Sequence, residues 1–235
     1  MKILVIDVGG THVKILATGQ TEERRVESGP TMSAAQMVRE VRALAKGWAF
    51  DAVSIGYPGA VRQGVPAAEP HNLGKGWVGF DFAGAFGCPV KIVNDAAMQA
   101  LGSFDKDKRT LLFLGLGTGL GTTLVVDGIV VPMELAHLPY RDSTFEDHVG
   151  EQALLRDGPK KWRKRVADVV QRLQAALLPD DVVLGGGNVH HMKTLPPGCR
   201  AGDNANAFIG GFRLWPAAAR AKRPARKTVA QGARP

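Results

Sequence analysis

The chain has 235 residues, 45% of them hydrophobic and 22% charged, which suffices for a sizeable core in one two-lobed unit or two small domains. Its two cysteines, Cys88 and Cys199, stand far apart and outside any CxxC pattern, which excludes a disulfide framework and a cysteine-rich zinc site. The N-terminus lacks the apolar core of a signal peptide, and no stretch approaches the ~18 apolar residues of a membrane span, so we expect a cytoplasmic protein.

The net charge of +8 is concentrated at the C-terminus. Residues 216–235 carry six Lys and Arg and no acid, so removing these six charges from +8 leaves +2 for residues 1–215. This Ala-, Pro- and Arg-rich segment has no aromatic residue, and we expect a disordered basic tail. The tail could contact a polyanion, but a solvated tail is favoured, with no membrane partner and no specific nucleic acid.

The first half of the chain predicts strands that end in glycine turns, together with helices. The elements expected there, in chain order, are strands over Lys2–Asp7 and His12–Thr18, a helix within residues 31–48 that starts at Thr31 or Ser33, a strand within 50–61, a loop-rich excursion over 62–87 ending in a short helix, a strand ending at Asn94-Asp95, and a helix over 96–104.

The second half repeats the opening theme of strand, glycine turn and strand. The elements expected there are a strand pair around "GLGTGLG", a turn at Asp127-Gly128, an amphipathic helix over 160–178 stopped by Pro179, a strand over 180–187 ending in glycines, and a closing helix over 204–215. The alternation predicts an α/β fold, and the polar stretch 105–108 predicts a link between two lobes, residues 1–105 and 106–215.

The first bend places a carboxylate beside two glycines. Asp7 ends an apolar run with no obvious partner nearby in the sequence, and Gly9 and Gly10 can reach unusual backbone angles and let a ligand approach the main chain. Hard cations such as magnesium take oxygen ligands, so this pattern indicates a metal-phosphate site. The alternative is a hairpin turn whose Asp caps its own backbone.

Two further glycine turns follow. "GLGTGLG" fits the dinucleotide pattern GxGxxG only formally, because it lies between two strands and does not open a helix. Two hairpins facing each other can wrap a polyphosphate with backbone N–H groups and hydroxyls. The third turn leaves Gly185, Gly186 and Gly187 without side chains, which suits close packing against a flat nucleobase or sugar.

Five segments, "DVGGTHVKIL", "GYPGAV", "VNDAAMQALG", "LGLGTGLGTTLVVDG" and "LGGGNV", in this order resemble the ROK (repressor, open reading frame, kinase) family of sugar kinases. The resemblance runs from Met1 to about Trp215 and implies the two-lobed actin-like (ribonuclease H-like) fold, with a central cleft between the lobes. Within the family, Lys14, "VRQG…HNLGKGWVG" and "KKWRKRV" resemble the bacterial polyphosphate glucokinases.

The resemblance implies a role for each matching residue. Asp95 matches the general base that takes the proton from the sugar hydroxyl, although Asn94-Asp95 can also be read as a helix cap. Asp7 would hold Mg²⁺ through water, and Lys14 is either a phosphate ligand or an exposed strand residue. The phosphate and magnesium group is Asp7, Gly9, Gly10, Thr11, Lys14, Gly117, Thr118 and Gly119, and the nucleotide group is Gly185, Gly186 and Gly187.

Sugar binding is assigned by the same resemblance to acids, amides and one histidine. Glu134 and His137 match a Glu-x-Gly-His motif, with Ala136 at its usual glycine, which leaves the position of the His137 ring open. Glu146 matches a second glutamate, for which Asp147 and Glu151 are alternatives. The full sugar-binding set is Asn72, Asn94, Asp95, Glu134, His137 and Glu146.

No structural zinc site is predicted, because residues 134–150 contain no cysteine, and His137 and His148 cannot complete a tetrahedral site alone. The pair His190-His191 is more typical of a surface than of a metal site. The expected cofactor is Mg²⁺, with ATP or inorganic polyphosphate as donor. The basic cluster Lys160, Lys161, Arg163, Lys164 and Arg165 either attracts the polyanionic donor or is a solvated helix face.

The sequence therefore predicts a homodimeric sugar kinase that transfers a phosphoryl group to the 6-hydroxyl of glucose. A kinase of fructose or an N-acetylated amino sugar is the alternative among enzymes. A catalytically silent sugar-binding protein remains open. A repressor is disfavoured, because the chain begins directly with the first phosphate hairpin instead of a helix-turn-helix.

Overall fold

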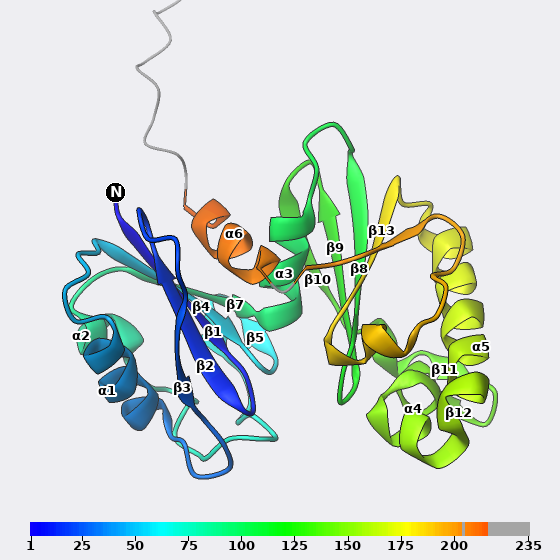
Figure 1. Ribbon diagram of the computed structural model, residues 1–235, viewed down its shortest axis with the longest axis horizontal. Helices are drawn as coiled ribbons and strands as arrows, with labels where there is room; N and C mark the ends of the chain where they lie inside the picture. The colour runs from blue at the N-terminus through cyan, green and yellow to red at the C-terminus, as the bar shows by residue number, and fades with distance from the viewer. Residues whose placement is uncertain (204, 216–235) are drawn as a thin grey trace, which may run out of the picture.

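The structure, a computed structural model, describes residues 1–203 and 205–215. The predicted basic tail and residue 204 of the closing helix lie outside these residues. Two five-stranded sheets form two lobes side by side (Figure 1). Within the two described ranges, no helix is long and apolar enough to cross a membrane.

The two sheets share one topology, with strand orders β3-β2-β1-β4-β7 and β10-β9-β8-β13-β14. In each sheet three strands joined by hairpins run antiparallel, and two further strands continue parallel to the first. The first sheet comprises β1 (Ile3–Val8), β2 (His12–Ala17), β3 (Arg24–Glu27), β4 (Ala52–Tyr57) and β7 (Val90–Asn94). The second comprises β8 (Thr110–Leu116), β9 (Leu120–Val126), β10 (Ile129–Met133), β13 (Asp181–Gly185) and β14 (Cys199–Ala201).

The helices cover these sheets, and two short hairpins lie outside them. The α-helices are α1 (Ala34–Leu44), α2 (Phe82–Phe86), α3 (Asp95–Ser103), α4 (Phe145–Val149), α5 (Glu151–Leu177) and α6 (Asn206–Arg213). The 3₁₀ helices are η1 (Leu135–His137) and η2 (Gly187–His191). The short hairpins are formed by β5 (Val61–Arg62) with β6 (Val65–Pro66), and by β11 (Pro139–Tyr140) with β12 (Ser143–Thr144).

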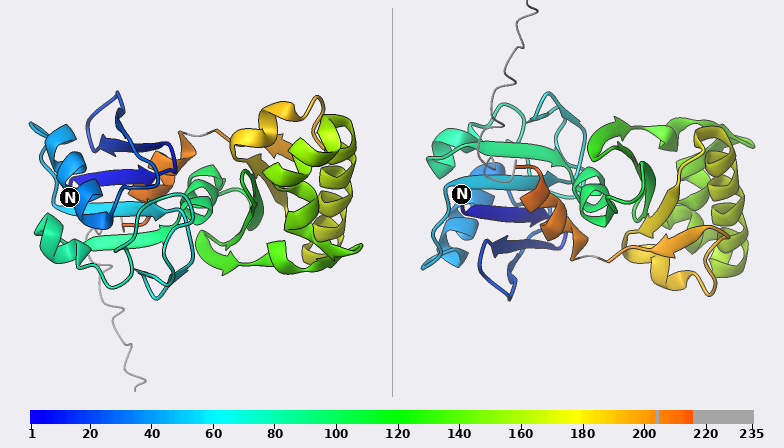
Figure 2. Two further views of the ribbon diagram at one scale, coloured as in Figure 1. Left: turned by 90° about the horizontal axis from the view of Figure 1, so that it is seen from below. Right: turned by 90° about the horizontal axis from the view of Figure 1, so that it is seen from above.

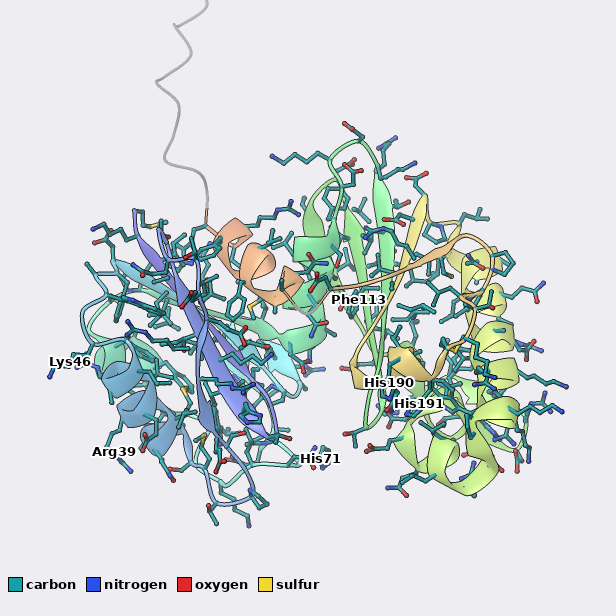
Figure 3. The ribbon with its side chains drawn as sticks, viewed as in Figure 1. Arg39, Lys46, His71, Phe113, His190 and His191 are labelled. Carbon is teal, nitrogen blue, oxygen red and sulfur yellow. The ribbon has the colours of Figure 1, made fainter. Side chains whose placement is uncertain are left out.

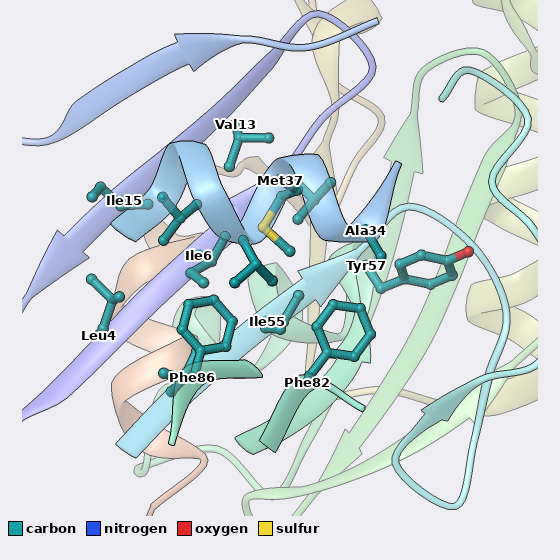
Figure 4. Packing of buried hydrophobic residues seen from close by; sticks show 14 of the residues in the cluster. Leu4, Ile6, Val13, Ile15, Ala34, Met37, Ile55, Tyr57, Phe82 and Phe86 are labelled. Atoms are coloured by element: carbon teal, nitrogen blue, oxygen red, sulfur yellow. The ribbon is translucent and has the colours of Figure 1, made fainter. Parts of the chain in front are cut away.

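Each lobe has its own apolar core. In the first lobe α1 and α2 bury Met37, Phe82 and Phe86 against Ile6 and Ile55 of the sheet (Figure 4). Every residue of β4 is buried, as expected for a central strand in parallel pairing. In the second lobe the corresponding cover comes mainly from α5.

The helices that follow each sheet meet between the lobes (Figure 1, Figure 2). α3 leaves the first sheet and packs on β8 and β9, while α6 leaves the second sheet and packs on β1 and β4. The two helices cross closely, because a Cβ on Gly102 would collide with the carbonyl of Asn206 and one on Gly210 with the carbonyl of Met98. The closing helix α6 therefore packs on the sheet of the first lobe.

Sequence and structure differ most in the second lobe. The helix predicted over residues 160–178 is only the second part of α5, which begins at Glu151 and breaks at Gly158 (φ 74°) before Pro159. Proline is tolerated in the first turn of a helix, so the Gly-Pro pair separates two helical segments and does not end one. The preceding α4 was also missed. It is five residues long, too short for a periodic pattern to show.

Candidate active site

The first hairpin bends at Gly9 and Gly10, as predicted, but for a different physical reason. Neither glycine has a positive φ, so the turn does not require the conformational freedom expected of them. Close approach explains them instead. A Cβ on Gly9 would lie 2.9 Å from the carbonyl oxygen of His12, and one on Gly10 would lie 3.1 Å from the Cβ of Asn72. Asn72 is thus brought to the first hairpin.

The loop that carries Asn72 is fastened by Glu69, a residue the sequence interpretation missed. The Glu69 carboxylate accepts hydrogen bonds from the backbone N–H groups of Trp77 (3.1 Å) and Val78 (3.3 Å). These bonds lower the pKa of Glu69. Trp77 is fully buried and its indole donates to the carbonyl of Met32 at 3.3 Å. No spacing in the sequence signals a carboxylate that binds backbone eight residues away.

Asp7 lies on β1 directly opposite Lys14 on β2. Burial raises the pKa of Asp7 to about 6, and the charge of Lys14 opposes that rise. The Lys14 Nζ also lies 3.8 Å from Glu23 Oε1, and its side chain is 29% exposed. The charge of this half-buried carboxylate is only partly offset by Lys14, so Asp7 offers an oxygen donor of the type that Mg²⁺ prefers.

Asn94 and Asp95 at the end of β7 separate into two roles. Asn94 Oδ1 caps α3 by accepting from the N–H groups of Ala96 (2.9 Å) and Ala97 (3.3 Å), and its amide donates to the Gly59 carbonyl at 3.0 Å. The cap reading therefore holds for Asn94, whose donor and acceptor atoms both have protein partners. Asp95 is half-buried, and desolvation of its carboxyl, together with the nearby charge of Asp7, raises its pKa to about 7.

The second hairpin approaches Asp95 through the start of α3. A Cβ on Gly121 of β9 would lie 3.0 Å from the Cβ of Ala96, the residue after Asp95. At the tip of this hairpin Thr118 is exposed. Asp7, Asp95 and the strand that leaves the second hairpin thus converge at the first turn of α3.

The third glycine turn packs against the second hairpin. Gly186 has φ 85°, and a Cβ there would collide with the backbone of Leu116, while one on Gly185 would collide with the ring of Phe113. At both positions the missing side chain is required by the close approach of other protein atoms. Gly186 and Gly187 also line an open cavity of about 630 Å³.

The sugar-binding candidates of the second lobe have partners within that lobe. Glu134 and His137 form a pair at 4.0 Å beside η1, with side chains 73% and 71% exposed. The Glu146 carboxylate accepts from the N–H of Leu120 at 2.9 Å, so in this structure it holds the second hairpin. Among the described residues, no hydrogen bond or ion pair joins these three to Asp95.

Three residues close in sequence to these candidates have structural roles. Ala136 is buried in the second core, which explains why a methyl is accepted at this position. Asp147, one of the alternatives to Glu146, forms a capping box with Thr144. The backbone N–H of Glu151 donates to the carbonyl of Gly117 at 3.0 Å, so its main chain braces the second hairpin.

The basic cluster of α5 is partly neutralised. Lys161 (3.1 Å) and Arg165 both pair with Asp157, and Arg163 donates to the carbonyl of His191 at 3.0 Å. The hydrogen bond from Arg156 to Asp157, together with these ion pairs, lowers the pKa of Asp157 strongly. In the part of the chain that the structure describes, no group of three or more His, Cys, Asp or Glu side chains is placed to hold a metal ion. A magnesium site would therefore draw on Asp7, water and phosphate oxygens.

Comparison with known proteins decides the family. A model of the ROK family matches residues 3–132, which is more than half of the chain and includes Asp7, Asp95 and both glycine hairpins. The chain belongs to the ROK family. It is similar to the polyphosphate glucokinase of Mycobacterium tuberculosis, with 28% identity over 204 residues that cover 77% of this chain and 76% of that protein.

Two further matches widen the range of activities. The N-acetylmannosamine kinase of Vibrio vulnificus is also 28% identical, over 68% of this chain and 56% of its own length. The crystal structure of an inorganic polyphosphate/ATP-glucomannokinase from Arthrobacter sp. superposes with a TM-score of 0.73 at 24% identity, covering 89% of this chain and 96% of that one. The predicted actin-like α/β fold is thereby confirmed, and the matches support a ROK-family sugar kinase.

Proposed function

We propose that the protein transfers a phosphoryl group from inorganic polyphosphate or ATP to the 6-hydroxyl of glucose. The observation that carries the proposal is Asp95, a half-buried carboxylate at the start of α3 that lies near Asp7 of the first hairpin strand and next to Ala96, which the second hairpin approaches. A single acid beside backbone turns that bind phosphate is the arrangement phosphoryl transfer requires, since this reaction depends mostly on positioning and charge stabilisation.

In the proposed reaction Asp95 accepts the proton of the sugar hydroxyl as its oxygen attacks the terminal phosphorus. The new O–P bond forms while the bridging P–O bond breaks, and the rest of the donor leaves with that electron pair. Backbone N–H groups of the hairpins at Gly10 and Thr118 would hold the phosphate chain. Magnesium, when bound near Asp7, would offset the negative charge of the phosphates.

The raised pKa of Asp95 predicts how activity depends on pH. A base must be ionised to accept a proton, and burial places the pKa of this carboxyl at about 7. We therefore expect kcat/KM to fall about tenfold for each unit of pH well below 7. A profile flat from pH 8 to pH 5 would contradict the assignment.

The sugar and the donor are tested together. The purified protein with Mg²⁺ is given glucose, mannose, fructose or N-acetylmannosamine, each with ATP or long-chain polyphosphate, and the sugar phosphate is quantified. Preferential phosphorylation of glucose supports the proposal, and no product with any pair contradicts it. N-acetylmannosamine is included because the sequence identity to an N-acetylmannosamine kinase, 28%, equals that to the polyphosphate glucokinase.

Two other predictions belong to this proposal. The homodimer is tested by the mass measured in sedimentation equilibrium. The division into lobes at residues 105–108 is tested by limited proteolysis, which should cut between α3 and β8 first if this link is the exposed boundary.

A further inference from the structure

The cavity beside the third glycine turn is lined by residues that have no role in the phosphoryl transfer proposed above. Its volume of about 630 Å³ lies in the range of ~300–1,000 Å³ typical of small-molecule sites. The lining residues are Gly186, Gly187, Val189, His190, Ala201, Gly202 and Asp203. Backbone, one imidazole and one carboxylate therefore meet at the turn that braces the second hairpin.

The imidazole belongs to an aromatic stack that reaches from the core to the cavity. His190 and His191 lie side by side on η2, with ring centroids 3.9 Å apart (Figure 3). His191 meets the buried Trp162 edge-on at 6.5 Å. The indole of Trp162 is fixed by a hydrogen bond of 2.7 Å to the carbonyl of Val149. His190 is thus a supported, exposed flat ring at the border of the cavity.

We propose that the ring of His190 stacks on the nucleobase of a nucleoside triphosphate and determines how well the enzyme uses a nucleotide donor. This inference rests on the proposed kinase function. A nucleobase offers a flat apolar face that an aromatic side chain can cover, whereas inorganic polyphosphate has no such group. Loss of one stacking face costs roughly 5- to 150-fold in affinity, and this cost should fall on the nucleotide alone.

Asp203 adds a polar contact to the same cavity. One of its carboxylate oxygens accepts from the N–H of Ala205 at 2.9 Å, which orients the group. A fixed carboxylate can accept hydrogen bonds from the two hydroxyls of a ribose, which inorganic polyphosphate also lacks. Asp203→Asn should weaken nucleotide use less than loss of the stacking ring, because the amide keeps one acceptor oxygen.

A purely structural role for His190 predicts different results. Its Nδ1 contacts the carbonyl of Gly187, so the ring could serve only to shape the glycine turn. Two substitutions separate the roles. His190→Phe keeps a flat face and loses the contact to Gly187, while His190→Ala loses both. Lys193→Ala is the matched control, since Lys193 is exposed in the next segment and does not line the cavity.

The experiment measures KM for ATP and for long-chain polyphosphate with the same sugar at saturation. We expect His190→Ala to raise KM for ATP roughly 5- to 150-fold, with His190→Phe and Lys193→Ala near wild type and polyphosphate unaffected throughout. The inference is overturned if Ala leaves the ATP value unchanged, if Phe is as impaired as Ala, or if both donors suffer equally. It is also overturned if only polyphosphate is used, although the kinase proposal would then stand. Failure of both donors in the wild type would contradict the kinase proposal itself.

Discussion

The two glycine hairpins occupy equivalent places in two sheets of the same topology, but different parts of the chain brace them. The first hairpin is braced by a residue next to its own sheet. Ser28, which directly follows β3, donates from its Oγ to the carbonyl of Gly9 at 2.6 Å. The second is held from outside its sheet, where Asn188 of η2 donates to the carbonyl of Gly117 at 3.0 Å and Glu146 of α4 binds Leu120. A glycine-rich bend can therefore be recognised locally, while its support cannot.

The hairpins also differ in charge. Asp7 and Lys14 oppose each other on β1 and β2, whereas β8 and β9 contain no charged residue at all. The second hairpin offers a ligand only backbone and hydroxyl groups. Titration near the site is thus a property of the first hairpin and of Asp95, which sits between the two.

The largest expected effect concerns the outside support of the second hairpin. Gly186→Ala would place a Cβ against the Leu116 backbone at a residue with φ 85°. We expect a loss of roughly 3 kcal/mol or more in the free energy of unfolding, measured by urea denaturation. Gly117→Ala is the matched control, because a Cβ there meets nothing within 4 Å and the loss should stay below about 1 kcal/mol. Equal losses would contradict this account of the turn.

The next effect tests the charge of the first hairpin. Burial raises the pKa of Asp7 from its ordinary 3.8 to about 6, so the folded protein binds more protons there than the unfolded chain between these pH values. Stability then falls as the pH rises through this window. Asp7→Asn removes that penalty and should stabilise the protein by up to roughly 3 kcal/mol at pH 8, with no gain below pH ~4.

The control for Asp7→Asn is a substitution in the second hairpin. Thr118→Ala changes an exposed residue at the tip of a hairpin without an acid, so its stability difference from wild type should not vary with pH. A gain for Asp7→Asn that stayed constant from pH 4 to pH 8 would show that Asp7 is not titrating in this range. Thermal melts at several pH values measure both variants.

The smallest effect concerns the Glu146 contact to Leu120. Glu146→Ala leaves the Leu120 N–H without its protein acceptor, which should cost roughly 1–3 kcal/mol, because the bond is to a charged group. Glu146→Gln keeps an acceptor oxygen and should lose less than half as much. Urea denaturation measures both variants. If Ala and Gln were equally stable, the contact would have no role in holding the hairpin.

The sequence could predict what depends on neighbouring residues. Ser33 caps α1 by accepting from Gln36 N, and Asp127-Gly128 forms the expected turn with both φ values positive, 49° and 80°. Both features rest on interactions over a few residues, which a local pattern encodes.

The contacts that assemble the site were not predictable in the same way. Glu69 fastens the Asn72 loop through backbone N–H groups, and Asn188 reaches the carbonyl of a residue 71 positions earlier. Nothing in a single sequence marks such long-range partners. The helix cap at Asn94, in contrast, depends only on the next few residues. The sequence offered it as an alternative, and it is present in the structure.

The central claim is that Asp95 activates the sugar hydroxyl between two phosphate-binding hairpins. The most direct test is turnover of Asp95→Asn with glucose, Mg²⁺ and the preferred donor, after circular dichroism has verified folding, with the exposed Asp105→Asn as control. We expect kcat to fall roughly 10²- to 10⁴-fold for Asp95→Asn and to stay near wild type for Asp105→Asn. Turnover within a few-fold of wild type in a folded Asp95→Asn protein would contradict the account.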